Sequence, residues 1–415
     1  MRHSKIKLSI ILLLSLFGSD CLSQSIRVPA EWEKQEAVHL AWYGNMRRDS
    51  VLCRVIEALQ PNVSIVLNIP ADSLKASVTQ QLSNYKIDIS ALNFIVDPDT
   101  DFWIRDPLYF ALENKQLKVV CFGYSMYGIY PDIAGEPIPE EIKRIGQVDE
   151  RVAKRSQLST INSDFVFEGG GLETNGKGTF LIIREMALQR NPGKTLADIE
   201  TELNRTLGAR KIIWLEKGLA EDKTMKNFGP FHKNYFGGGA NMHIDELCRF
   251  VNEHTVVLPY ISEYDRLNSP IDSINYKMLE QNYQILKAST TADGIPLTIF
   301  RMPMPEIEQL KNIQVLDRNA VQDVRQFGFT IGDTIFRIPA ASYMNFFISN
   351  DVVLVPKYWK PGMTETQRQK DDEAKIQFSR LFPSKRVVQI FTLSINRGGG
   401  GIHCMTREQP YVNNK

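Results

Sequence analysis

The feature of this 415-residue chain that most constrains its fold is a recurring order of secondary-structure signals. A short apolar strand carrying a polar residue is followed by a second strand, a helix and a third strand. In the clearest copy, Asn175-Gly176 is a strong hairpin signal. A capping-box variant at Thr195 opens the helix and Gly208 closes it. This copy predicts elements over 165–168, 179–183, 195–207 and 211–215.

The same order recurs elsewhere in the chain. An incomplete version covers 37–42, 50–59 and 64–69, and a hairpin is expected for 103–112 with 117–122. Two full copies are predicted over 243–250, 255–260, 273–288 and 297–302, and over 342–348, 352–356, 364–381 and 386–391. The helix at 273–288 is expected to bury Ile274, Met278, Ile285 and Leu286. About five units of this kind predict a closed or arrayed α/β assembly. Because only the order of elements repeats, a chance succession stays open.

The first residues predict an export signal. A basic start precedes an apolar stretch at 8–17 that is too short to span a bilayer, and small and polar residues at 18–25 offer a cleavage site. We expect residues 1–23 to be a signal peptide and 24–415 to form one catalytic domain of an exported protein, periplasmic or extracellular. Lipid anchoring at Cys21 is disfavoured because Asp20 stands where a small residue is wanted.

Composition excludes two classes of partner. A net charge of +1 argues against nucleic-acid binding, which needs a basic stripe to displace counterions. No later stretch is apolar enough for stable membrane insertion. Four cysteines remain after Cys21, too few for a disulfide framework, and a pair among Cys53, Cys121 and Cys248 stays open. The sequence does not indicate an oligomeric state.

Cys404 is the candidate nucleophile. It follows the glycine run 398–401, and glycines allow close backbone approach on one side of a thiol while leaving space for a substrate on the other. A packed structural thiol is the alternative.

Polar residues inside apolar stretches open the successive units. We expect His243 and Asp245 to lie on one face of a strand, because alternate strand residues share a face. Burying such groups without partners is costly, so they are expected to converge on one centre. The full set is Asp106, Glu168, His243, Asp245 and Asn345.

These groups suit a planar cation as substrate. The three carboxylates can bracket a guanidinium with paired hydrogen bonds, which exposes its carbon to a thiolate. The imidazole can pass a proton to the departing amine and later take one from water. A cysteine peptidase would not need the extra carboxylates. A zinc site at His243, Asp245 and Cys404 would leave the other carboxylates unused.

Six motifs follow one another along the chain. They are Trp103-Ile104-Arg105-Asp106, Glu168-Gly169-Gly170-Gly171 with Asn175-Gly176-Lys177-Gly178-Thr179, Arg190-Asn191-Pro192, His243-Ile244-Asp245-Glu246, Ser342-Tyr343-Met344-Asn345-Phe346 and Gly399-Gly400-Gly401-Ile402-His403-Cys404. In this order they resemble the agmatine deiminase and Porphyromonas-type peptidylarginine deiminase family, part of the guanidine-modifying pentein superfamily. The resemblance starts near 27–32 and runs to the C-terminus.

The resemblance implies a pentein fold, five ββαβ units around a pseudo-fivefold axis with a central active-site channel, and chemistry without a cofactor or metal. It implies Cys404 as nucleophile, His243 as general acid and base, and Asp106 and Asp245 as guanidinium-binding carboxylates. The substrate-binding set would add Trp103, Glu168 and Asn345.

Departures from the agmatine-specific pattern bear on the substrate. Pro107-Leu108-Tyr109 replaces x-Gly-Pro, 393–397 lacks Arg-Glu-Ile, and Gly401 replaces an asparagine. With the export signal, they favour a small-molecule or peptide guanidino substrate of the arginine type, converted to citrulline with release of ammonia. Agmatine, giving N-carbamoylputrescine, is the alternative. A catalytically silent arginine-binding protein is a more remote one.

Overall fold

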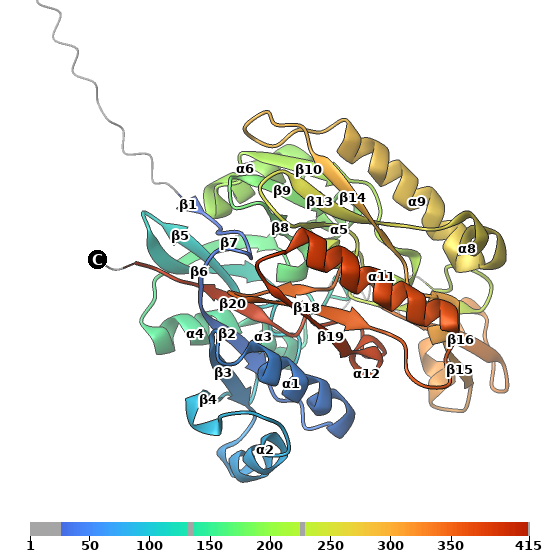
Figure 1. The fold of residues 1–415 in the computed structure, drawn as a ribbon, viewed down its shortest axis with the longest axis horizontal. Helices are drawn as coiled ribbons and strands as arrows, with labels where there is room; N and C mark the ends of the chain where they lie inside the picture. The colour runs from blue at the N-terminus through green and yellow to red at the C-terminus, as the bar shows by residue number, and fades with distance from the viewer. Residues whose placement is uncertain (1–25, 131–136, 225–228, 414–415) are drawn as a thin grey trace, which may run out of the picture.

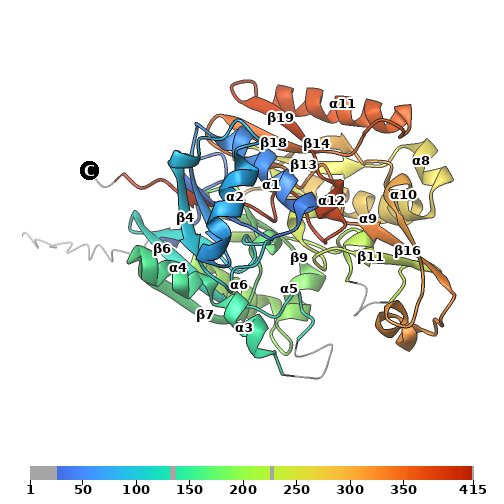
Figure 2. The ribbon, with the colours of Figure 1, turned by 90° about the horizontal axis from the view of Figure 1, so that it is seen from below.

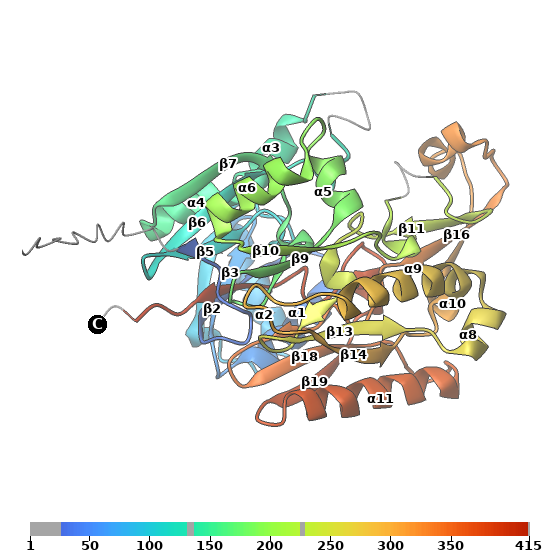
Figure 3. The same ribbon diagram turned by 90° about the horizontal axis from the view of Figure 1, so that it is seen from above.

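The computed structural model describes residues 26–130, 137–224 and 229–413, so the predicted signal peptide and Cys21 lie outside the described residues. The chain folds into a mixed α/β structure (Figure 1). Helix α11 (Glu365–Leu381) runs along the outside of the molecule in two further views (Figures 2 and 3). No helix among the described residues combines the length and apolar character that crossing a membrane requires.

Five sheets share one connectivity: a short antiparallel strand, a longer strand, one or two helices, and a strand parallel to the second. One of them joins distant parts of the chain, because β20 (Arg407–Pro410) pairs antiparallel with β2 (Gln35–Ala41). The other strands of this sheet are β3 (Ser64–Ile69) and β4 (Leu92–Val96). Helix α1 (Met46–Leu59) connects β2 to β3, and α2 (Lys75–Leu82) lies in the connection from β3 to β4.

The other four units follow one another along the chain. The first has β5 (Tyr109–Glu113), β6 (Gln116–Gly123), α3 (Glu140–Gly146), α4 (Val148–Ser156) and β7 (Thr160–Val166). The second has β8 (Glu173–Thr174), β9 (Thr179–Ile183), α5 (Arg184–Arg190), α6 (Leu196–Leu207) and β10 (Lys211–Leu215). The third has β12 (Arg249–Phe250), β13 (Thr255–Tyr260), α8 (Glu263–Asn268), α9 (Pro270–Lys287) and β14 (Thr298–Pro303). The fourth has β17 (Phe347–Ile348), β18 (Val352–Lys357), α11, β19 (Arg386–Phe391) and α12 (Leu393–Asn396).

A further sheet stands outside this scheme. It pairs β11 (Tyr235–Gly238) with β16 (Thr334–Pro339) in parallel, and β16 with β15 (Asn312–Val315) antiparallel. The short α10 (Ile307–Leu310) leads into β15, and β1 (Ile26–Arg27) adds an edge strand to β5. The sequence repeat did not predict this sheet.

The predicted polar-bearing strands are wrong in one consistent way. The polar residues lie in turns just before short first strands, not on the strands themselves. Residues 165–166 end β7, and the hairpin arm opposite β9 is β8. Ile244–Glu246 forms a 3-10 turn, so His243 and Asp245 do not alternate along a strand. Ile244 and Asp245 are both buried, and a turn buried on all sides shows the same polar and apolar alternation as a strand.

The helix signals are confirmed at the ends more than on the faces. Thr195 and Asp198 form a capping box at the start of α6, and Gly208 ends it in the left-handed conformation (φ 69°). The predicted inner face of α9 is confirmed at Leu286, which is buried, and in part at Ile285, which packs partly buried against the core, whereas Ile274 and Met278 are not among the buried residues. Asn275 and Asn282 lie on its buried side, where they bond to the chain at 216–221, so apolar periodicity missed that face.

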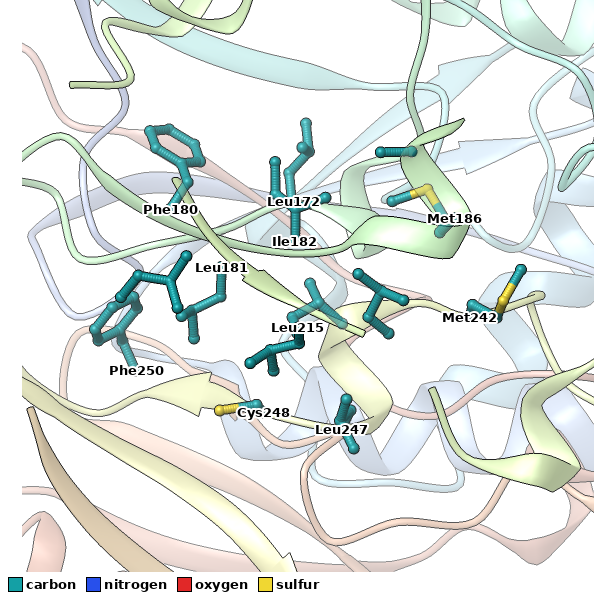
Figure 4. Packing of buried hydrophobic residues seen from close by; sticks show 14 of the residues in the cluster. Leu172, Phe180, Leu181, Ile182, Met186, Leu215, Met242, Leu247, Cys248 and Phe250 are labelled. Carbon is teal, nitrogen blue, oxygen red and sulfur yellow. The ribbon is translucent and has the colours of Figure 1, made fainter. Parts of the chain in front are cut away.

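An apolar core lies beneath the turns that carry the polar residues. Figure 4 shows Phe180, Leu181 and Ile182 of β9 in one buried apolar cluster that also includes Met242 and Cys248. The thiols of Cys53, Cys121 and Cys248 are free and buried in separate apolar clusters. No disulfide joins these three cysteines, and each is a packed thiol.

Candidate active site

Polar side chains from five turns meet in one buried cluster, as the sequence predicted. Around His243, Nδ1 lies 3.7 Å from Asp106 Oδ1 and 4.0 Å from Asp245 Oδ1, and Nε2 lies 3.6 Å from Glu168 Oε2. Cys404 Sγ lies 3.5 Å from Asp245 Oδ2. None of these residues is more than 4% exposed. The cluster therefore brings a thiol, an imidazole and three carboxylates within reach of one small cation.

Glycines permit this close approach. A Cβ on Gly170 would stand 2.5 Å from His243 Nδ1 and 2.9 Å from Asp245 Oδ2. A Cβ on Gly400 would stand 2.9 Å from Cys404 Sγ and 3.0 Å from Trp103 Cζ3. Any larger residue would displace these groups, so the prediction that glycines frame the thiol is confirmed. Trp103 borders the same loop and is largely buried.

The surroundings of Cys404 favour the protonated form of its thiol. Burial raises its pKa well above 9, and the Asp245, Glu246 and Asp106 carboxylates add to the effect. The Asn345 side-chain N–H lies 3.2 Å from Sγ and 2.9 Å from Glu246 Oε1. A cation placed among the carboxylates would offset their charge and favour the thiolate.

The imidazole of His243 is held charged. Burial alone would lower its pKa, but the neighbouring Asp106, Glu168 and Asp245 carboxylates raise it to about 9. Neither ring nitrogen has a close hydrogen-bond partner among the described residues, so both remain available to a ligand. Burial raises the pKa of Asp106 to about 6, with the His243 charge opposing that shift.

Arg190 and Asp222 hold the turn that carries His243. Asn241 and Met242 just before it have left-handed backbones, with φ of 68° and 71°. Arg190 donates to the carbonyls of Ala240 and Asn241 at 3.2 and 3.1 Å, and also to both oxygens of Glu168. Asp222 accepts the backbone N–H groups of Ala240 and His243 at 2.8 and 2.7 Å. Such a clamp keeps a strained backbone in place.

Two consecutive buried hydrogen bonds connect Asp245 through His403 to Glu31, near the start of the described chain. Asp245 Oδ2 lies 2.8 Å from His403 Nδ1, and His403 Nε2 lies 2.7 Å from Glu31 Oε2. Glu31 is paired with Arg105 at 3.2 Å and Arg249 at 3.0 Å. Burial raises the pKa of Asp245, but the His403 hydrogen bond and the nearby cationic groups, including His243 and Arg249, together outweigh it, so the net pKa is lowered and the carboxylate stays charged.

Sequence analysis missed several members of this site. Arg190 stood in a family motif without an assigned role, and Glu246 and His403 were quoted only as neighbours of predicted residues. No local signal marked Asp222 or Glu31, since their partners lie far along the chain. Within the described residues, no group of three or more His, Cys, Asp or Glu side chains has the arrangement of a metal site.

Comparison with known proteins gives a consistent result. The family model for Porphyromonas-type peptidyl-arginine deiminase matches residues 27–410. An agmatine deiminase from Pseudomonas aeruginosa (strain LESB58) is 26% identical over 404 residues, covering 94% of this chain and 96% of that protein. The solved agmatine deiminase of Enterococcus faecalis superposes with a TM-score of 0.72 at 23% identity, covering 94% and 96% of the two chains. An agmatine deiminase of C. jejuni with substrate bound gives a TM-score of 0.69 at 19% identity, covering 94% and 97%.

Proposed function

The chain belongs to the Porphyromonas-type peptidyl-arginine deiminase family, and from this premise we propose that it hydrolyses the guanidinium of an arginine-type substrate to a ureido group and ammonia. It is a hydrolase acting on C–N bonds of linear amidines. The observation that carries the proposal is the cluster of Cys404, His243 and three carboxylates in one buried space.

Each residue of the cluster has a role in the proposed reaction. The guanidinium binds among Asp106, Glu168 and Asp245, its charge offsets theirs, and the Cys404 thiol releases its proton to solvent. The Cys404 thiolate then bonds to the guanidinium carbon, and His243 gives its proton to the departing nitrogen as the C–N bond breaks. His243 next takes a proton from water, whose oxygen bonds to the same carbon and displaces Cys404. The products are the ureido compound and ammonia.

Two substrates fit this chemistry, and we propose arginine, free or within a peptide, as the first. The departures at Pro107, at 393–397 and at Gly401 support it, since they depart from the agmatine-specific pattern. Agmatine is the second candidate, and the names of the relatives favour it.

We expect kcat/KM to be higher for arginine or a blocked arginine peptide than for agmatine. Ammonia release from the three compounds, with identification of citrulline or N-carbamoylputrescine, measures this. A ten-fold preference for agmatine would overturn the substrate choice, because it corresponds to about 1.4 kcal/mol of discrimination away from the guanidinium. Absence of turnover with all three would overturn the deiminase itself.

The pH dependence of kcat/KM should change slope near 6 and near 9, in addition to the rise toward high pH that ionisation of the Cys404 thiol contributes. Below about 6, Asp106 gains a proton and loses its attraction for the guanidinium. Above about 9, His243 loses the proton that the leaving nitrogen needs. Because the pKa of the Cys404 thiol lies well above 9, loss of the His243 proton should flatten the profile near pH 9, and an unchanged slope through pH 9 would contradict a protonated His243 in the free enzyme. The two changes of slope belong to the coupled cluster and not to single residues.

The proposal also covers the arrangement of the five units and the export of the protein. We propose that the five ββαβ units surround a pseudo-fivefold axis with the cluster at its centre, and that 24–415 form a single domain. Their shared connectivity supports this arrangement. We also propose that the protein is exported and that residues 1–23 are removed as a signal peptide. Intact-mass measurement of the protein recovered from periplasm and medium tests the cleavage and the destination together.

A further inference from the structure

A depression of about 500 Å³ carries an unusual concentration of positive charge. No acidic residue of the described chain lines it, while four of its lining residues are cations. The cations are Arg47, Arg48, Lys360 and Arg397. Asn45, Ser394, Phe391 and Leu393 complete the wall. A concave surface with these groups is suited to an oxyanion, because guanidinium and ammonium groups donate to oxygens with charge-assisted hydrogen bonds.

The depression lies where loops leave the carboxyl ends of strands in two sheets, β2 in one and the parallel pair β18 and β19 in the other. Asn45 and Arg48 follow β2, Lys360 follows β18, and Arg397 follows β19. In open α/β sheets, ligands characteristically bind outside the carboxyl ends of strands. The N-terminus of α1 also begins here and adds the positive end of its dipole. Its first free N–H groups are already capped, since Asn45 accepts from Arg47 and Arg48.

The cationic side chains lack counter-ions. Among the described residues, none of the four forms an ion pair within 4.0 Å. Arg48 instead lies over the Tyr43 ring at 4.4 Å, and Lys360 lies 5.9 Å from the Phe391 ring. Asp49 and Asp101 experience the Arg48 charge but do not pair with it. No direct ion pair therefore offsets the mutual repulsion of the four cations, and an anion bound among them would do so.

The depression borders the loop of the nucleophile. Arg48 Nη2 lies 2.5 Å from the position that a Cβ on Gly398 would take, and Gly400 packs in the same way against Cys404 Sγ. Three aromatic rings in contact lead from Arg48 toward the thiol. The Tyr43 ring, which lies under Arg48, has its centre 5.7 Å from that of Phe102, and the Phe102 ring centre lies 4.9 Å from that of Trp103. Trp103 itself lies against Gly400 beside the thiol.

We propose that this depression is an oxyanion subsite that receives the carboxylate of the substrate while the guanidinium lies at Cys404. The inference rests on the proposed deiminase function and deepens it, because a carboxylate is what distinguishes arginine from agmatine. A free oxyanion such as phosphate has the same chemistry, and the experiment separates the two sources.

The test compares arginine with arginine amide, which removes the carboxylate charge and keeps the α-amine. Wild type should prefer arginine by at least ten-fold in kcat/KM, and the double variant Arg48→Gln/Arg397→Gln should reduce that preference several-fold while retaining turnover of arginine amide. Arg318→Gln removes an exposed arginine outside the depression and should leave the preference unchanged. Thermal melting of all variants controls for folding.

Binding of inorganic phosphate, measured by calorimetry, forms the second arm. If phosphate binds wild type but not the double variant while the substrate preference is unaltered, the subsite exists and serves a free anion, which overturns its assignment to the substrate carboxylate. If neither the preference nor phosphate binding responds to the double variant, the inference is overturned as a whole. Failure of the deiminase proposal would appear as absent ammonia with every substrate, and the phosphate arm would still report on the depression.

Discussion

Replacing Cys404 with serine should reduce ammonia release to background while the protein stays folded. A serine hydroxyl is a far weaker nucleophile here, because the buried carboxylates that already raise the pKa of the thiol would disfavour an alkoxide even more. Serine preserves the size and can still accept the hydrogen bond from Asn345. The melting temperature should therefore change little. Steady-state ammonia assays and thermal melting measure the two effects.

Covalent labelling sharpens this prediction. A haloacetamidine, which mimics the guanidinium, should modify wild type at Cys404 and leave the serine variant unlabelled. Cys121→Ala is the matched control, since it removes a buried thiol from a different cluster and should retain turnover. Near wild-type activity in Cys404→Ser would rule out covalent catalysis through this residue.

Asp106→Asn and Asp245→Asn should each lower kcat/KM by about a thousand-fold, corresponding to roughly 4 kcal/mol of transition-state stabilisation. Each change keeps the size of the side chain and removes the negative charge that faces the guanidinium. In the Asp106→Asn variant, the amide oxygen could still accept from the Gly170 N–H, which lies 3.0 Å from Asp106 Oδ1 in wild type. The loss should therefore come from charge and not from a collapsed turn.

Although Asp106→Asn should lower kcat/KM, it should not lower the free energy of unfolding. Burial raises its folded pKa from 3.8 to about 6, so the folded state holds the proton more tightly than the unfolded chain does. Such a group lowers stability as pH rises from about 4 to about 6, and at pH 7 the charge costs roughly 2–3 kcal/mol. Asp106→Asn removes that cost, and we expect it to melt no lower than wild type.

Asp371→Asn provides the contrast. Asp371 accepts from Tyr343 Oη at 2.6 Å and from the Trp359 backbone N–H at 2.7 Å, away from the cluster. Oδ1 of Asp371 also accepts from Gln367 Nε2 at 3.0 Å, so both oxygens have donors and the amide nitrogen of Asn would face one of them, unlike in Asp106→Asn. The change should therefore lower the melting temperature and leave turnover per folded molecule nearly unchanged. Badly destabilised Asp106→Asn and Asp245→Asn proteins would instead mark those residues as structural partners.

The candidate site was predictable where chemistry leaves a local signature. A thiol after a glycine run and lone polar residues inside apolar stretches identified Cys404, Asp106 and His243, because buried reactive groups need small neighbours and charged partners. Their exact local conformation was not predictable. A turn buried on every side and a half-buried strand share one pattern of alternation, and only the packing around Asp245 distinguishes them.

The supporting residues escaped prediction for a different reason. Asp222 acts through backbone N–H groups of Ala240 and His243, which any residue type except proline would offer. The buried amides of α9 break the apolar periodicity by which a helix face is predicted. Regular elements with strong caps or apolar runs, such as α6 and β19, came out close to their observed bounds because their signals are local.

The pairing of β20 with β2 has a consequence for the order in which the protein matures. β20 follows directly on the Cys404 turn, and His403 meets Glu31 across 372 positions of sequence. Contacts of such separation form late, because loop closure must be complete before they contribute. On the ribosome, a growing chain would already hold Asp106, Glu168 and His243 while still lacking the thiol. The chemistry would therefore become possible in one step once the Cys404 turn has been made, and a nascent chain that ends before Cys404 could not attack a guanidinium.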